Sequence, residues 1–270
     1  MTLKSLAPLI VVALSTVPAL GHEFWIDPVD TAVPQGEEIV ANIRVGQAFD
    51  GTAYSFFPKN FRRFEILSGE ATAPVEMRIG DLPALAQTAP EGLAILVHET
   101  RDYDLTYREF DKFDAFVRHK DAAWVLDAHA ARGLPETDFK EVYSRYAKSL
   151  VAVGDGQGSD RAVGLETELV AGLNPYTDDL SGGLPVTLYY QGAPWADAQI
   201  EVFEKAADDS VAISTVRTDA GGQAIVPVRP GHRYMLDAVK LREPGEEVSE
   251  KTGAVWESLW ANLTFAVPDE

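Results

Sequence analysis

Short apolar or alternating runs, separated by proline, glycine and aspartate, dominate the chain after its first 21 positions. Runs of this length with period-two alternation and turn residues between them are typical of β-strands. In the first half, the pattern predicts strands at 23–26, 38–45, 61–67, 75–79 and 93–99. In the second half, it predicts strands within PVTLYY, AQIEVFEKA, AISTVRTDAGGQAIVPV, HRYMLDAVKL and ESLWANLTFAV, and a hairpin turn at 219–222.

The period changes to a helical one in the middle of the chain, at about 107–149. Thr106 and Glu109 have the spacing of a helix capping box, and apolar residues follow it every three or four positions. A second helix is predicted further on, where five apolar residues share one helical face: Phe139, Val142, Tyr143, Tyr146 and Leu150.

The glycine-rich polar stretch VGDGQGSD at 153–160 has no apolar periodicity and is predicted to be a linker. We therefore expect a mainly β protein with two β-sandwich-like domains, at 22–152 and 161–270. The helical segment would be a short insertion at the end of the first domain.

The first 21 residues have the pattern of a cleaved signal peptide. A positive start at Lys4 is followed by a short apolar run and then by small residues up to Ala19 and Gly21. We expect export and cleavage after Gly21, which would make His22 the first residue of the mature protein. A cut after Ala19 would instead leave His22 inside the chain.

Composition limits the chemistry that is open to this protein. There is no cysteine, so a metal would have to be bound through nitrogen and oxygen. The formal net charge of −19 argues against nucleic acid or an anionic membrane surface as a partner. No segment after the leader is long and apolar enough to span a bilayer, so we expect no membrane insertion.

None of the common enzyme motifs is present: GxSxG, HExxH, the P-loop and a strand-to-helix GxGxxG are all missing. The GDGQG sequence at 154–158 lies in the polar linker, where a hinge is a better interpretation than a phosphate-binding loop. The sequence therefore does not predict an enzyme, and it assigns no catalytic residue.

The chain has five histidines, and three of them are candidate metal ligands: His22, His98 and His232. His98 shares strand parity with apolar neighbours and is expected to point inward, where a hydrogen-bonded core histidine is the alternative. His232 begins a predicted strand after a turn, where solvent exposure is the alternative. His119 and His129 are expected to be solvated or to cap helices.

His22 is the strongest candidate because a mature N-terminal histidine offers two nitrogens, its α-amine and its imidazole. Together they can chelate one metal, and a second histidine would complete the three-nitrogen arrangement known as a histidine brace. Such sites suit Cu(II) or Ni(II). The alternative is that an exported protein begins with histidine without any metal.

Several motifs resemble a bacterial exported family catalogued as a domain of unknown function, whose name refers to nickel uptake as a substrate-specific region. They run over nearly the whole mature chain and comprise HEFWIDP directly after the leader, VGQAF, EVYSRYAKSLVAVG, GLETELVAGLNPY, GLPVTLYYQGAPWADAQIEVF, TDAGGQAIVPVRPG and WESLWANLTF. The resemblance implies a periplasmic accessory protein of transition-metal handling. It also implies a second domain similar to transthyretin-like or carboxypeptidase-regulatory sandwiches, and it supports His22 as the leading histidine of the motif.

The sequence thus leads to one main functional hypothesis and to rivals. The main one is a periplasmic protein that binds a divalent transition metal (nickel, cobalt or copper) at its N-terminus and acts with an inner- or outer-membrane metal transporter. A metal-free sandwich that binds a protein or a glycan is the first rival. A copper oxidase or monooxygenase built on the same brace is a weaker one.

Overall fold

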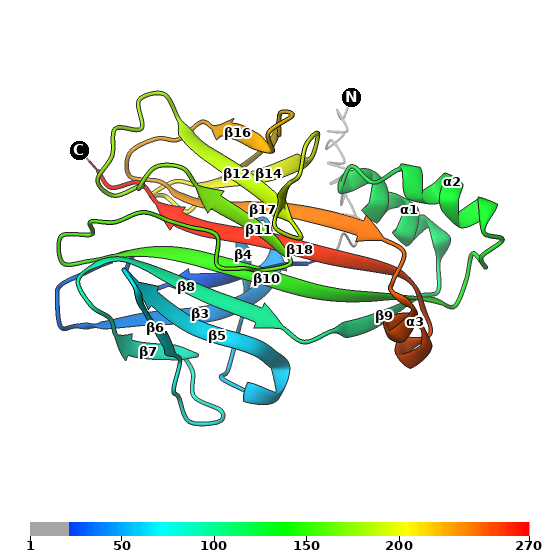
Figure 1. Cartoon of the computed structure of the whole chain (residues 1–270), viewed down its shortest axis with the longest axis horizontal. Helices are drawn as coiled ribbons and strands as arrows, with labels where there is room; N and C mark the ends of the chain where they lie inside the picture. Colours follow the sequence, from blue (N-terminus) through cyan, green and yellow to red (C-terminus); the bar gives the residue numbers. More distant parts are fainter. Residues whose placement is uncertain (1–21, 270) are drawn as a thin grey trace, which may run out of the picture.

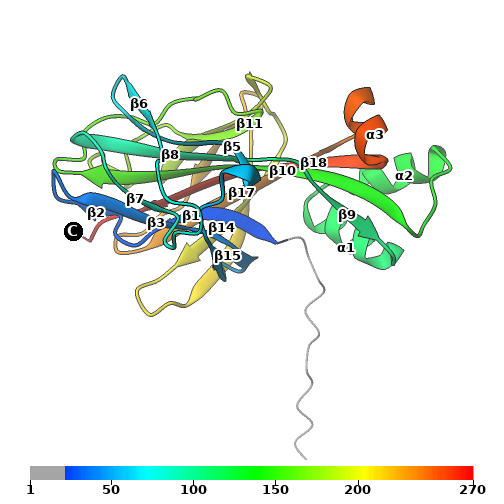
Figure 2. The same ribbon diagram turned by 90° about the horizontal axis from the view of Figure 1, so that it is seen from below.

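The computed structural model describes residues 22–269, so the predicted signal peptide (1–21) and its cleavage site lie outside the described residues. Within that range the chain is mainly β, with short helices at one end (Figures 1 and 2). This confirms the predicted mainly β, sandwich-type fold.

A ten-stranded central sheet runs through the whole molecule. Eight of its strands follow in spatial order: β15 (Val211–Arg217), β14 (Gln199–Lys205), β17 (Arg233–Arg242), β18 (Ala254–Ala266), β10 (Phe139–Val153), β8 (Gly92–Thr100), β5 (Phe61–Ser68) and β6 (Ala71–Pro74). Two more strands pair with β10: β9 (Tyr103–Tyr107) and β2 (Ala32–Val33).

The two halves of the chain share this sheet. β10 from the first half pairs in parallel with β18 from the second half, in a register that runs from Lys140 opposite Ala254 to Ser149 opposite Thr264. The predicted boundary at 153–160 therefore does not interrupt the central sheet. Each half instead forms its own smaller sheet, which packs on the shared central sheet.

Two smaller sheets cover opposite faces of the central sheet, because side chains alternate along its strands. In β8, Ala94 and Leu96 belong to the core beneath the first small sheet, whereas Ile95 and Val97 belong to the core beneath the second. The first small sheet contains β1 (Glu23–Pro28), β3 (Glu38–Gln47), β4 (Asp50–Tyr54) and β7 (Leu85–Thr88). The second contains β11 (Thr167–Ala171), β12 (Leu184–Tyr190), β13 (Ala193–Pro194) and β16 (Gln223–Val226).

The helices lie at the end of the sheet where β9 pairs with β10 (Figure 1). They are α1 (Phe110–His119), α2 (Trp124–Ala131) and α3 (Glu246–Thr252), and a 3-10 turn, η1 (Pro58–Asn60), precedes β5. Phe113 and Phe116 of α1 pack with Trp256 and Trp260 of β18. Helices α1 and α2 thus cover the part of the central sheet that the first small sheet leaves free.

The predicted second helix is wrong, because residues 139–153 form β10 at the centre of the sheet. This strand is buried on both faces, so apolar residues occur on each side of it. Val142, Tyr146 and Leu150 are spaced by four, which satisfies a strand period of two as well as one helical face. The periodicity alone could not distinguish the two.

Three smaller predictions also fail. Thr106 lies in β9, and α1 begins after Glu109 without a side-chain cap, so there is no capping box. Residues 75–79 form no strand. The turn at 219–222 is present, but the strands on either side of it join different sheets: β15 pairs with β14, and β16 pairs with β12.

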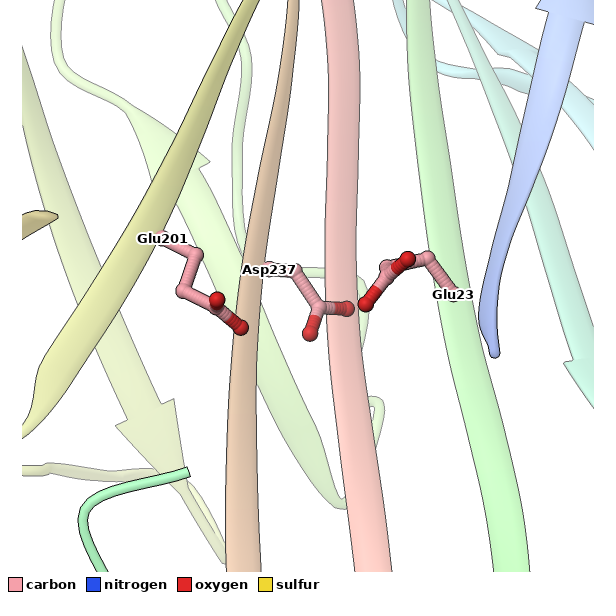
Figure 3. A group of neighbouring side chains, drawn as sticks. All are labelled: Glu23, Glu201 and Asp237. Atoms are coloured by element: carbon pink, nitrogen blue, oxygen red, sulfur yellow. The ribbon is translucent and has the colours of Figure 1, made fainter. Parts of the chain in front are cut away.

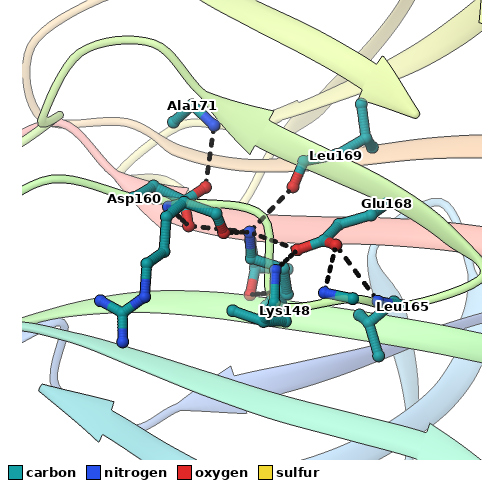
Figure 4. Close-up of polar contacts among 10 residues, drawn as sticks. Lys148, Asp160, Leu165, Glu168, Leu169 and Ala171 are labelled. Carbon is teal, nitrogen blue, oxygen red and sulfur yellow. Dashed lines mark hydrogen bonds and ion pairs between the residues drawn. The ribbon is translucent and has the colours of Figure 1, made fainter. Parts of the chain in front are cut away.

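The stretch predicted as a linker is tied to the central sheet by a buried ion cluster (Figure 4). The Lys148 ammonium lies 2.7 Å from the Asp160 carboxylate and 3.2 Å from the Glu168 carboxylate. Asn174 also donates to the carbonyls of Gly156 and Gly158. Segment 153–160 is therefore held at both ends by the core.

Candidate functional site

A pocket of about 370 Å³ opens beside the start of β1, between the first small sheet and the central sheet. Its size lies in the lower part of the range of small-molecule sites, about 300–1,000 Å³. Fourteen residues line it; six are phenylalanine or tyrosine, and none is acidic. Two of the predicted ligands, His22 and His98, lie in this lining.

His22 is exposed, and the backbone around it is fixed on two sides. Its carbonyl accepts a hydrogen bond of 3.0 Å from Nη2 of Arg145 in β10. The next residue, Glu23, starts β1, pairs with Gly46 of β3 and is itself buried. The backbone of His22 and Glu23 is therefore fixed by both the central sheet and the first small sheet.

His98 lies at the apolar end of the pocket, near the end of β8, and only 3% of it is exposed. The rings of Phe24, Phe61 and Phe64 surround it at centroid distances of 5.0, 5.3 and 5.0 Å. Burial lowers its pKa to about 3, so the imidazole is neutral near pH 7. Its Nδ1 is buried and has no hydrogen-bond partner among the described residues. An unpaired buried nitrogen is costly, and it is free to bind a ligand.

Arg145 is the single cationic side chain in the lining. It lies over the ring of Tyr143 at 4.7 Å and near the rings of Phe24 and Trp260 at 5.8 and 5.9 Å. No carboxylate of residues 22–269 lies within salt-bridge distance of it, and its Nε is buried without a hydrogen-bond partner. Burial lowers the pKa of this guanidinium, which remains charged at neutral pH.

His232 is not part of this pocket. Its Nδ1 lies 2.8 Å from the Glu204 carboxylate, at the turn before β17. The next residue, Arg233, contacts Asp27 near the end of β1, whereas His22 precedes the start of that strand. Five residues of extended chain separate the two ends by roughly 16 Å. The structure therefore brings together two of the three predicted histidines.

The remaining two histidines are each engaged elsewhere. His119 Nε2 lies 2.7 Å from the Glu201 carboxylate. His129 is buried, its Nδ1 accepts a hydrogen bond of 3.0 Å from Trp256, and its Nε2 lies 3.0 Å from the Pro135 carbonyl. The prediction that His129 is solvated is wrong, because α2 packs this side chain onto β18.

A second cluster lies on the other side of the β1 start, and the sequence did not reveal it. Glu23, Glu201 and Asp237 come from β1, β14 and β17, and their carboxylates turn toward a common space (Figure 3). One oxygen from each lies within 4.8 Å of the others. The one signal in the sequence was a charged residue inside an apolar strand pattern, as with Asp237 in YMLDAVKL.

Lys120, directly after α1, occupies the centre of this carboxylate cluster. Its ammonium lies 3.2 Å from Glu23 and 3.1 Å from Asp237, and it also binds Glu201. Burial lowers the Lys120 pKa, but the three carboxylates outweigh burial and raise it. Burial raises the pKa of Glu23 to about 7 and also raises that of Asp237, although Lys120 opposes both shifts. The place of a metal ion is thus taken by an ammonium group.

Fold and site together define a class: a mainly β protein in which His22 lies in an aromatic pocket free of acidic side chains. The chain belongs to DUF4198, a family described as a domain of unknown function, whose model matches residues 19–241. The match includes every residue that lines the pocket. No curated protein matches the chain. No helix in residues 22–269 combines the length and apolarity needed to cross a bilayer.

Proposed function

We propose that this protein is a periplasmic accessory protein that binds a divalent transition metal in the pocket at its N-terminus and acts with a metal uptake system. One observation carries the proposal: His22 and the unpartnered, neutral His98 line the same pocket. The periplasmic location rests on the leader sequence and the family resemblance. The transporter partner rests on the resemblance alone.

The chemistry of the donors fits nickel, cobalt or copper. After cleavage before His22, one residue would supply an amine and an imidazole, and His98 would add a third nitrogen from the opposite sheet. Nitrogen donors of this kind suit late first-row metals. Metal ligands must be deprotonated, and the low pKa of His98 means that it gives up no proton on binding.

The backbone around the first ligand is already fixed, which favours tight binding. Arg145 holds the His22 carbonyl, and Glu23 is paired both to β3 and to Lys120. A preformed chelate loses less conformational entropy on binding than a flexible terminus does. The carboxylate cluster is a weaker metal site, because Lys120 would first have to leave it.

Calorimetry with Ni(II) and Cu(II) on protein that begins at His22 tests the proposal. One added alanine before His22 converts the amine into an amide, and His98→Phe removes the third nitrogen while keeping an aromatic ring. We expect each change to weaken binding on the order of 100-fold or more. His232→Gln is the matched control, and its affinity should equal that of the wild type.

Affinity should also fall in acid, because metal ligands must be deprotonated and protons compete with the metal for the same nitrogens. Binding that survives the added alanine unchanged would contradict the proposal.

A metal-free binding module is the second candidate, and the rim of the pocket favours it. Tyr54 and Phe57 line the pocket with exposed fractions of 50% and 37%. Exposed aromatic rings beside a small-molecule pocket are typical of sites that stack on a sugar or another flat ligand. In that case Tyr54→Ala would abolish ligand binding and the added alanine would have no effect.

A further inference from the structure

The charges around the pocket are unlike those of the rest of the molecule. The chain has 42 acidic residues against 23 lysines and arginines, yet none of the fourteen lining residues is acidic. Arg145 is the one charged side chain among them, apart from any charge on the histidines. A divalent ion held only by neutral nitrogens would keep its full charge beside this guanidinium. Like charges so close together, without a counterion, repel each other.

Arg145 also lacks the partner that a half-buried arginine normally has. Its guanidinium is packed among aromatic rings, Nη2 donates to one backbone carbonyl, Tyr143 is a further hydrogen-bond partner, and Nε has no partner among residues 22–269. Burying a charge without a counterion is unfavourable, whereas a planar guanidinium matches a carboxylate well. The carboxylates of Glu141 and Asp237 act on Arg145 only from beyond salt-bridge distance, so no anion of residues 22–269 contacts the guanidinium.

The remaining lining indicates which kind of anion would fit. Tyr103 and Tyr143 are stacked at a centroid distance of 5.7 Å beside Arg145, and four more aromatic residues complete the apolar part of the wall. This surface suits an organic body better than a small inorganic ion. A pocket of about 370 Å³ is also larger than a single metal ion requires.

We propose that the pocket binds a small aromatic or heterocyclic carboxylate together with the metal, with the carboxylate bound between Arg145 and the ion. This inference rests on the proposed function, since the metal is one of its two partners. The anion would neutralise both cations, and its ring would pack on the tyrosines. The metal would thus be carried as a complex with a small chelator.

The test is a calorimetric titration of Ni(II)-loaded protein with picolinate, a pyridine ring with one carboxylate. Picolinamide has the same ring with a neutral amide and is the matched ligand. We expect picolinate to bind at least about tenfold more tightly than picolinamide. In Arg145→Gln this preference should shrink by at least about fivefold, because the carboxylate keeps its contact with the ion but loses the guanidinium. The ratio of the two ligand affinities is the readout, since the variant also loses the hydrogen bond to the His22 carbonyl and is expected to bind Ni(II) alone more weakly.

Two further variants separate the role of Arg145 from general effects. Arg63→Gln removes an equivalent partly buried arginine that is paired with Glu65 and lies outside the pocket, so it should keep the full preference. Arg145→Lys keeps the charge and should keep part of the preference for picolinate. Thermal melting of each variant checks that it is folded. If Arg145→Gln is unfolded, Arg145→Lys is the deciding variant. A preference for picolinate that is not reduced in Arg145→Lys then overturns the inference.

The same titrations distinguish failure of this inference from failure of the proposed function. Tight Ni(II) binding without a preference for picolinate, or a preference that is undiminished in Arg145→Gln, overturns the inference alone. Absence of binding of both Ni(II) and Cu(II) overturns the proposed function. If metal-free protein then binds picolinate through Arg145, the pocket is an anion site without a metal, and the shared site proposed above is wrong.

Discussion

The two sides of the β1 start differ in the net charge that they bury: the pocket side buries a cation, and the helix side buries a cation with three carboxylates. On the pocket side, Arg145 has no carboxylate of the described part of the chain within salt-bridge distance. On the helix side, Lys120 faces three of them. Trp260 lies between the two cations, 4.8 Å from the Lys120 ammonium and 5.9 Å from the Arg145 guanidinium.

This difference shows what each side is suited to do. The Lys120 cluster satisfies its own charges and fixes β1, β14, β17 and the end of α1 together, so it is a structural element. The pocket is lined by a cation without a carboxylate contact and by a histidine whose Nδ1 has no hydrogen-bond partner among residues 22–269. An excess of unpaired polar groups marks the side where binding is expected.

Removing the cation of the helix side should have the largest effect. Lys120→Met leaves Glu23 and Asp237 without their cation and Glu201 with His119 alone, and we expect a loss of about 3–5 kcal/mol in the free energy of unfolding at pH 7. Urea unfolding measures it. Lys112→Met, which removes an exposed lysine paired with Glu109, is the control and should change stability by less than about 1 kcal/mol. A small loss in Lys120→Met would contradict the structural role of the cluster.

The sequence predicted two residues of the pocket, but neither the pocket itself nor its electrostatics. Strand parity correctly placed His98 inward, and the leader pattern singled out His22. Their proximity depends on the first small sheet lying over β8, which no local pattern encodes. The Lys120 cluster joins four segments that are far apart in the chain, and carboxylates in an acidic protein give no sign of which ones are buried together.

The wrong prediction of a helix at 139–153 also has its cause in tertiary structure. The side chains of β10 are apolar on both faces because the strand lies in the middle of three layers, and sequence periodicity reports only one layer at a time. Arg145 and Lys148 belong to this strand and serve opposite faces: one lines the pocket and the other binds Asp160 and Glu168.

The pocket side should lose stability in acid. Burial lowers the pKa of His98 to about 3, so the unfolded chain takes up a proton below its ordinary value of 6.5 and the native state does not. Between pH 6.5 and 4, His98 should cost the wild type about 3 kcal/mol relative to His98→Phe. Urea unfolding of both proteins across this range measures the difference. Parallel pH profiles would show that His98 is not held neutral.

The helix side should respond to pH in the opposite direction, with a smaller effect. Burial raises the pKa of Glu23 to about 7, so the native state retains a proton that the unfolded chain releases above about 4.5. Stability from this group is complete below pH 4.5 and is lost as the pH rises through 7. Relative to Glu23→Gln, the wild type should lose about 2 kcal/mol between pH 5 and 8. Glu76→Gln, at an exposed position, should follow the wild type.

The parallel pairing of β10 with β18 has a consequence for the order of folding. β18 follows every other strand along the chain, yet it lies between β10 and β17 at the centre of the sheet. Until residues 254–266 are available, β10 and β17 present open edges to each other and to other chains. Such late, long-range closure slows folding and prolongs the exposure of edges that aggregate. Such a chain is expected to aggregate less if it stays unfolded until residues 254–266 are also available.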